Sequence, residues 1–289
     1  MKLSDIHIRD PFILLDDGKY YLYGTRFNGE KGMYPQESEG TDVYVSEDLE
    51  NFSQPIPVFR RDSSFWGTHH FWAPEVHKYN GRYYMFVTVA SKTRNRGVQI
   101  LVCDTPDGNF TPCAKDAVTP KEWECLDGTL YVEDGRPYMV FCHEWSQIGD
   151  GEMCLIEMSE DLSRAVSEPV TLFKASAPSW ATGFTDSMDK YVTDGPFLHR
   201  SSDGKLLMIW SSIANGMYVE AVSYSENGIK GPWMHYNELL YREDGGHGML
   251  FYDKAGQLMF TMHYPNTNDL ERPVIVRVRE EKGMLTIIQ

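Results

Sequence analysis

Hydrophobic and polar positions recur in the same order five times along this chain of 289 residues. In most copies a small or acidic residue, followed by Pro or Gly, leads into a short apolar strand, a glycine turn and a second apolar strand rich in aromatic residues. The copies begin at Asp10, Ala73, Asp127, Asp194 and His247. This spacing is about one four-stranded blade with its loops, which is typical of a repeat architecture. The pattern predicts an all-β, five-bladed β-propeller.

Four further segments repeat after the hairpins, at residues 43–52, 98–110, 153–163 and 219–233. Each has apolar residues at near-alternate positions, then a polar turn and a closing aromatic residue or Leu, which predicts the third and fourth strands of a blade. Residues 273–287 are expected to complete the last blade. No linker rich in Pro or Ser interrupts the repeats, so we predict a single catalytic domain over residues 1–289.

Composition narrows the partners and the compartment. The formal charge of −15 disfavours nucleic acids and anionic membrane surfaces, because both require concentrated Lys and Arg. The five cysteines have no metal-binding spacing, and an odd number favours free thiols over a disulfide framework. Together with the lack of an export signal in the given chain, this predicts a cytoplasmic protein, or a periplasmic or secreted one if a signal peptide was removed.

Three of the five copies begin with a carboxylate, at Asp10, Asp127 and Asp194. In a propeller the inner strands begin at the same end of one channel, so these side chains are expected to meet there. A meeting of three carboxylates indicates acid/base chemistry. The alternative is that Asp127 and Asp194, each followed by Gly, belong to ordinary turns.

The combined motifs resemble glycoside hydrolase family 43, whose members are five-bladed β-propeller arabinanases, arabinofuranosidases and xylosidases. The resemblance covers nearly the whole chain and is carried by RDPF at 9–12, WAPEV at 72–76, LDGT at 126–129, DGPF at 194–197 and GGHG at 245–248. It implies an inverting hydrolase of arabinose- or xylose-type bonds, with galactose-type bonds as a further option, in plant-type polysaccharides or oligosaccharides. The oligomeric state stays open.

The resemblance also implies roles for the three carboxylates. Asp10 matches the general base, and Asp127 matches the residue that raises the pKa of the acid and orients it. The general acid of the family is a Glu before Gly-Pro, whereas this chain has Asp194 there. An Asp reaches one methylene less far, so Glu144, in the loop after the third motif, is an alternative proton donor. If Asp194 is the acid, burial and the nearby Asp127 carboxylate are expected to raise its pKa.

Two functions of other kinds stay open at this point. A catalytically silent, carbohydrate-binding propeller would keep the fold without the chemistry. A five-bladed sucrose or fructan hydrolase would retain the anomeric configuration, and its two carboxyl groups would lie about 5–5.5 Å apart instead of about 6.5–9.5 Å.

The fifth motif and the loops supply the remaining candidates. In the resembled family a His at the position of His247 lies near a calcium ion in the channel, although a single imidazole is a poor calcium ligand and a structural role is the plain alternative. Substrate contacts are predicted from Phe27, Trp72, Glu144, Trp145 and Arg272, and the segments 26–40 and 176–192 are expected to wall the pocket. Trp180 is a further aromatic candidate. For the aromatic residues the alternative is packing between blades, and for Arg272 it is an exposed loop.

Overall fold

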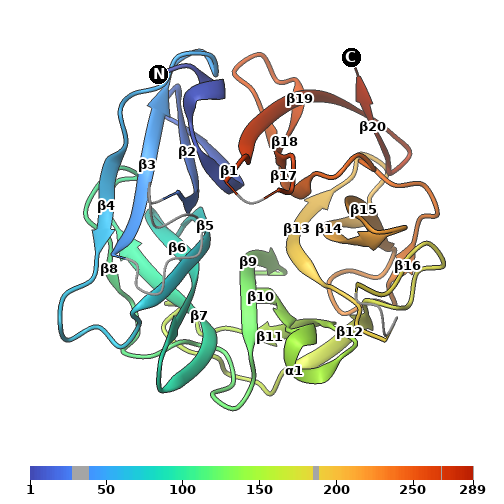
Figure 1. Cartoon of the computed structure of the whole chain (residues 1–289), viewed down its shortest axis with the longest axis horizontal. Helices are drawn as coiled ribbons and strands as arrows, with labels where there is room; N and C mark the ends of the chain where they lie inside the picture. Colours follow the sequence, from blue (N-terminus) through green and yellow to red (C-terminus); the bar gives the residue numbers. More distant parts are fainter. Residues whose placement is uncertain (28–38, 185–188, 268, 289) are drawn as a thin grey trace.

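The protein is a ring of five antiparallel sheets around a central channel (Figure 1). The computed structural model describes residues 1–27, 39–184, 189–267 and 269–288. In these residues the helices are short, a 3₁₀ turn η1 (Leu3–Asp5) and one α-helical turn α1 (Trp145–Ile148). None of the described helices has the length and apolar character needed to cross a membrane. The predicted all-β, five-bladed propeller is confirmed.

Each blade is built from four strands that follow one another in the chain. Blade 1 has β1 (Ile8–Asp16), β2 (Lys19–Arg26), β3 (Gly40–Ser46) and β4 (Ile56–Arg60). Blade 2 has β5 (His69–Tyr79), β6 (Arg82–Ser91), β7 (Arg94–Cys103) and β8 (Thr111–Pro112). Blade 3 has β9 (Cys125–Glu133), β10 (Arg136–His143), β11 (Glu152–Glu157) and β12 (Val170–Lys174). Blade 4 has β13 (Asp194–Arg200), β14 (Leu206–Ala214), β15 (Met217–Ser225) and β16 (Met234–His235). Blade 5 has β17 (Gly246–Tyr252), β18 (Leu258–Tyr264), β19 (Arg272–Glu281) and β20 (Met284–Ile288).

The first strand of every blade lies innermost and faces the channel (Figure 1). Because no sheet mixes strands from the two ends of the chain, the ring closes through contacts between blades 1 and 5. Lys254 donates its backbone N–H to the Tyr20 hydroxyl at 2.9 Å, and Tyr20 packs edge-on against Phe251 with ring centroids 6.3 Å apart. These contacts hold the first and last blades together.

Aromatic and aliphatic side chains fill the space between and within the blades. Tyr23, Phe86, Phe141, Trp210 and Phe260 are among the largest fully buried side chains. Fully burying a large apolar side chain contributes roughly 1.5–3 kcal/mol, so this packing is the main source of the ring's stability.

The fourth strands begin later than the sequence pattern predicts. After β3, the Ser46 hydroxyl and the Asp48 carboxylate accept backbone N–H groups in a compact turn, and Phe52 then packs into the core at 5% exposure. Phe110, Leu162 and Trp233 close the equivalent turns of other blades and are also buried. The closing apolar residue therefore anchors the turn in the core, and the fourth strand starts beyond it.

Each inner strand bends sharply near its start. One residue there has a left-handed backbone, namely Asp10 (φ 53°), Ala73 (φ 44°), Asp127 (φ 55°), Gly195 (φ 52°) and His247 (φ 50°). In every blade the bend inserts one extra residue against the second strand, as a β-bulge does. A bend of this kind redirects the side chains at the strand entry toward the channel mouth.

The bends correct the register predicted for the fourth motif. The repeat pattern aligns Asp194 with Asp10 and Asp127, but the left-handed residue of blade 4 is Gly195. Asp194 pairs across its hairpin with Ser211, just as Arg9 pairs with Thr25 in blade 1. Asp194 therefore enters the channel one residue earlier than the other two carboxylates.

A ring of hydrogen bonds links the bends of neighbouring blades. We call the backbone N–H of each of the five bulge residues a bend amide, that is, the N–H of Asp10, Ala73, Asp127, Gly195 and His247. Bend amides donate to Thr25 (from Ala73, 2.8 Å), Thr88 (from Asp127, 2.9 Å), Ser211 (from His247, 2.7 Å) and His263 (from Asp10, 3.3 Å). Each acceptor lies on the second strand of the preceding blade, with blade 5 preceding blade 1. A buried amide is costly when unpaired, so these contacts stabilise the bends.

Candidate active site

The channel end where the inner strands begin opens into a cavity of about 430 Å³. It is lined by four acidic residues and two tryptophans, namely Asp10, Asp127, Asp194, Glu144, Trp72 and Trp145. The three predicted catalytic carboxylates therefore share one cavity. Asp10 and Asp127 are almost fully buried, and Asp194 is half-buried.

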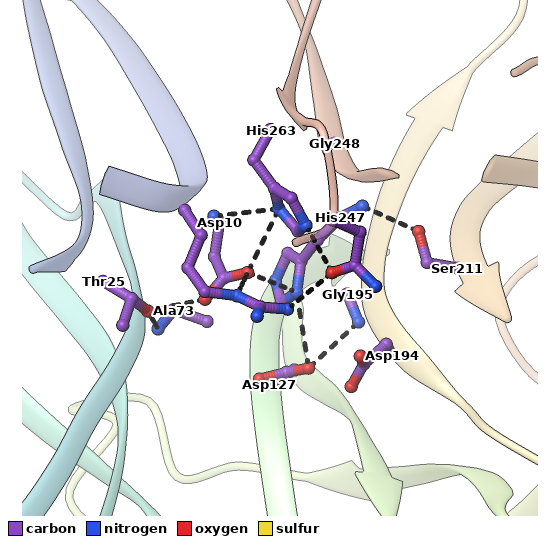
Figure 2. A network of polar contacts seen from close by, with 12 residues as sticks. Asp10, Thr25, Ala73, Asp127, Asp194, Gly195, Ser211, His247, Gly248 and His263 are labelled. Carbon is purple, nitrogen blue, oxygen red and sulfur yellow. Dashed lines mark hydrogen bonds and ion pairs between the residues drawn. The ribbon is translucent and has the colours of Figure 1, made fainter. Parts of the chain in front are cut away.

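Cationic and polar groups hold the Asp10 carboxylate on several sides (Figure 2). The Thr25 hydroxyl donates to Oδ2 at 2.6 Å, and Arg9 Nε and His247 Nδ1 both lie 3.2 Å from Oδ1. Burial alone would raise the pKa of Asp10, but the close contacts with His247 and Arg9 and the hydrogen bond from the Thr25 hydroxyl hold it well below its usual range. The ionised carboxylate is therefore the favoured form of Asp10.

His263 is neutral and fixed in one tautomer. Its Nδ1 accepts the backbone N–H of Asp10, which leaves the proton on Nε2, and Nε2 lies 3.0 Å from Asn266 Oδ1. Burial and the Arg9 guanidinium lower the pKa of His263 to about 3. His263 therefore orients the bend at Asp10 without adding charge to the site.

The Asp194 and Asp127 side chains lie near each other beside His247 (Figure 2). A hydrogen bond between the two carboxyl groups contributes to the pKa of each of them. The Tyr218 hydroxyl donates to Asp194 Oδ2 at 2.9 Å, and the Gly195 N–H donates to Asp127 Oδ2 at 3.0 Å. A carboxyl pair in hydrogen-bond contact must share a proton, because two carboxylates at this distance repel each other.

Burial and charge raise the pKa of both members of this pair. Burial and the Asp10 carboxylate raise the pKa of Asp127 to about 7. Burial and the Asp127 carboxylate raise the pKa of Asp194 well above its usual range, which confirms the expectation from the sequence. The protonated form is therefore favoured at Asp194, whereas the ionised form is favoured at Asp10.

Glu144 lies in the same cavity but is committed to another partner. Its carboxylate forms an ion pair with Arg96 and accepts a hydrogen bond from the Ser146 hydroxyl. Arg96 also pairs with Glu124 at 2.9 Å. Glu144 thus serves as the counter-charge of a largely buried guanidinium in the cavity wall.

The predicted substrate contacts separate into two groups. Trp72 and Trp145 line the cavity, as do Phe184 and Val192 from the predicted wall segment 176–192. The His70 and Trp72 rings stack with their centroids 3.5 Å apart, and the Arg96 guanidinium lies 5.8 Å from the centroid of the Trp72 ring, so these two contacts hold the indole in the cavity wall.

Phe27, Arg272 and Trp180 are not among the residues that line this cavity. Phe27 stacks on His7 at 3.7 Å, Arg272 donates to the carbonyl of Glu271 at 2.7 Å, and Trp180 packs against Trp210. The lining of this cavity therefore gives these three predicted contacts no support, and they stay predictions. Most of the other expected wall segment, 28–38 of 26–40, lies outside the described residues.

The arginine beside Asp10 is Arg9, which the sequence analysis did not select. It contacts Asp10, Glu271 at 3.5 Å and Asn266 at 3.2 Å, and it lines the cavity. Its place directly before Asp10 was the available signal, because residues before a bend enter the channel as Asp194 does.

A metal ion fits poorly at the centre of this arrangement. Asp127, Asp194 and His247 each place one possible ligand atom within 4.8 Å of the others. However, His247 Nδ1 already lies between Asp10 Oδ1 at 3.2 Å and Asp127 Oδ2 at 3.8 Å, and the Asp194–Asp127 contact requires a proton. A calcium ion bound to these oxygens would displace that proton.

A comparison with protein families decides the relationship. The model of the family described as Glycosyl hydrolases family 43 matches residues 4–280. The chain belongs to glycosyl hydrolase family 43. The resemblance inferred from the motifs is therefore confirmed over nearly the whole chain.

Relatives within the family have been named for arabinan and xylan chemistry. The chain is 24% identical over 156 residues to the extracellular endo-alpha-(1->5)-L-arabinanase 1 of Bacillus subtilis (strain 168), covering 49% of this chain and 45% of that protein. It is 24% identical over 152 residues to xylosidase/arabinosidase 43A of Humicola insolens, covering 50% and 46%. The matched segments thus span about half the length of these two relatives.

The structure of this chain is also similar to the crystal structure of an endo-arabinase from Bacteroides thetaiotaomicron VPI-5482 over nearly its whole length. The endo-arabinase is 39% identical to this chain, covers 98% of both chains and has a TM-score of 0.87.

The raised pKa of Asp194 predicts a stability effect. The folded protein keeps this proton at pH values where an unfolded Asp, with a pKa near 4, has released it, so the free energy of unfolding falls as pH rises above about 4. We expect Asp194→Asn to remove this loss. The substitution should therefore raise the free energy of unfolding by roughly 1–3 kcal/mol more at pH 7 than at pH 4. Urea unfolding at both pH values measures it. The exposed Asp17→Asn is the control, and an equal effect of Asp194→Asn at both pH values would contradict the assignment.

Proposed function

We propose that this protein is an inverting glycoside hydrolase that cleaves arabinose-type bonds in plant-type polysaccharides or oligosaccharides. The observation that carries the proposal is the pair of oppositely shifted carboxyl groups on the two sides of His247, Asp10 ionised and Asp194 protonated. Inverting hydrolysis needs this combination, because one group removes a proton from water while the other donates a proton to the leaving oxygen.

Asp10 is the general base in this proposal. Its carboxylate takes a proton from a water molecule as that water attacks the anomeric carbon. Arg9, Thr25 and His247 fix the carboxylate in one orientation and keep it ionised, so the base needs no rearrangement before the reaction.

Asp194 is the general acid and Asp127 is its modulator. Asp194 passes its proton to the glycosidic oxygen as the bond to the anomeric carbon breaks, and the Tyr218 hydroxyl holds the side chain in place. The negative charge of Asp127 disfavours ionisation of Asp194 until that moment. The tether from Gly195 to Asp127 supports this role, since it joins the acid's own backbone to the modulator.

An arabinose-type substrate is supported by the resemblance to the Bacteroides endo-arabinase along the whole chain and by the charge of the protein. The net charge of −15 favours neutral sugars over acidic ones. The xylose-type and galactose-type substrates remain comparison substrates for the assay. Because the Bacillus relative is named extracellular, export is a proposal to set beside the prediction of a cytoplasmic protein.

No step of this mechanism uses a metal ion. The imidazole of His247 lies between Asp10 and Asp127 instead, with Nδ1 3.2 Å from Asp10 Oδ1 and 3.8 Å from Asp127 Oδ2, where it helps to orient the base. The calcium prediction stays untested.

The base is tested with Asp10→Asn on linear arabinan and on aryl arabinofuranosides, xylosides and galactosides. An amide keeps an oxygen for Thr25 but cannot accept the proton from water, so we expect kcat to fall about 10²–10⁴-fold with KM nearly unchanged. Asp17→Asn, at the exposed end of the same hairpin, is the matched control. Near-normal turnover in Asp10→Asn would remove Asp10 from the mechanism. Binding of arabinan by the wild-type protein without hydrolysis of any substrate would favour a silent carbohydrate-binding propeller.

The acid is tested by the dependence on the leaving group. We expect Asp194→Ala to lose far more activity on alkyl glycosides than on aryl glycosides with acidic phenols, since a good leaving group departs without a proton. Glu144→Gln is the comparison, and we expect it to lower activity on both kinds of substrate alike. The assignment is wrong if Glu144→Gln discriminates between the leaving groups and Asp194→Ala does not.

A further inference from the structure

The ring of hydrogen bonds between neighbouring blades has one exception, at blade 3. The second-strand residues that pair across from the bends are Thr25, Thr88, Cys142, Ser211 and His263, paired with Arg9, Trp72, Leu126, Asp194 and Gly246. Four of the five accept the bend amide of the next blade through an oxygen or a ring nitrogen. The fifth is a cysteine, and a thiol sulfur is a weak acceptor.

The bend amide that Cys142 would serve belongs to Gly195, the residue directly after Asp194. This amide donates to Asp127 Oδ2 at 3.0 Å. Cys142 is fully buried beside the same carboxyl pair, and burial together with the Asp127 and Asp194 charges raises the pKa of its thiol far above the usual range. The thiol is therefore neutral, and its sulfur is a much weaker hydrogen-bond acceptor than a hydroxyl oxygen.

We propose that Cys142 is a positioning residue that leaves the Gly195 amide to Asp127 and thereby fixes the backbone of Asp194 against the modulator carboxylate. A hydroxyl at this position would capture the amide, as Ser211 captures that of His247 at 2.7 Å. The Asp127 carboxylate would then lose its tether to the strand that carries the acid. This inference rests on the proposed role of Asp194 as proton donor.

The effect of Cys142 on proton donation by Asp194 is measured better by comparing substrates with different leaving groups than by a pH profile alone. Seven ionisable side chains besides Asp194 face the Asp127 carboxyl or its partner, namely Asp10, Glu75, His247, Arg9, Glu220, Tyr218 and Cys142. A pH profile would combine all of them. The leaving-group dependence responds only to how well the proton is delivered.

The test is Cys142→Ser with Cys142→Ala as the matched control. Serine supplies the competing hydroxyl, whereas alanine removes the sulfur without supplying an acceptor. We expect Cys142→Ser to lower kcat on alkyl arabinosides at least tenfold more than on activated aryl arabinosides, with KM unchanged. We expect Cys142→Ala to keep the wild-type ratio between the two substrates. Thermal unfolding of both variants shows whether the fold is kept.

Each outcome decides something different. Equal substrate ratios in wild type, Cys142→Ser and Cys142→Ala would overturn the proposal about Cys142, and so would a changed ratio in both variants. A wild-type protein that hydrolyses neither substrate would instead contradict the proposed function.

A measurement on otherwise unchanged protein covers the case in which Cys142→Ser does not fold. In protein labelled with ¹⁵N-glycine, the Gly195 amide proton is expected to move downfield as Asp127 ionises, because an amide bonded to a carboxylate is deshielded. Asp127→Asn should abolish this movement. A Gly195 signal that is the same in wild type and in Asp127→Asn at every pH would overturn the proposal.

Discussion

The arrangement of the site depends on five bends, each stabilised by a side chain of a neighbouring blade or, at Gly195, by the Asp127 carboxylate. A left-handed backbone is costly for Asp10, Asp127 and His247, which are not glycines. The cost is offset because each bend amide finds a buried acceptor across the blade interface. The same contacts that link neighbouring blades therefore bring Asp10, Asp127 and Asp194 to one end of the channel.

The bends place chemically similar carboxyl groups in opposite electrostatic surroundings. Asp10 has Arg9 and His247 as close partners, so its carboxylate form is favoured in spite of burial. Asp194 has a carboxyl group and a tyrosine hydroxyl as its partners, so its neutral form is favoured. In the proposed mechanism this difference in environment separates the base from the acid, which is a recurring way for a protein to run both reactions at one pH.

The repeat in the sequence was sufficient to predict the propeller and the common cavity of Asp10, Asp127 and Asp194. The raised pKa of Asp194 was expected only from the family resemblance, which implies that Asp194 is the acid. The repeat was not sufficient for details that depend on the bends. Asp194 precedes its bend whereas Asp10 forms one, and a one-residue shift of this kind is invisible when both motifs read as Asp followed by Pro or Gly. The same limitation explains why Arg272 was selected in place of Arg9. The β-bulge at Asp10 determines which neighbouring side chain contacts the Asp10 carboxylate, and the sequence alone does not show where the bulge lies.

The most direct test of the account is the configuration of the first sugar released. If Asp10 activates water on one face of the anomeric carbon while Asp194 protonates the leaving oxygen on the other, the product must have the inverted configuration. Proton NMR of the earliest product, recorded before mutarotation, measures this. The account predicts the inverted anomer from an aryl arabinofuranoside, and a first product with retained configuration would contradict it.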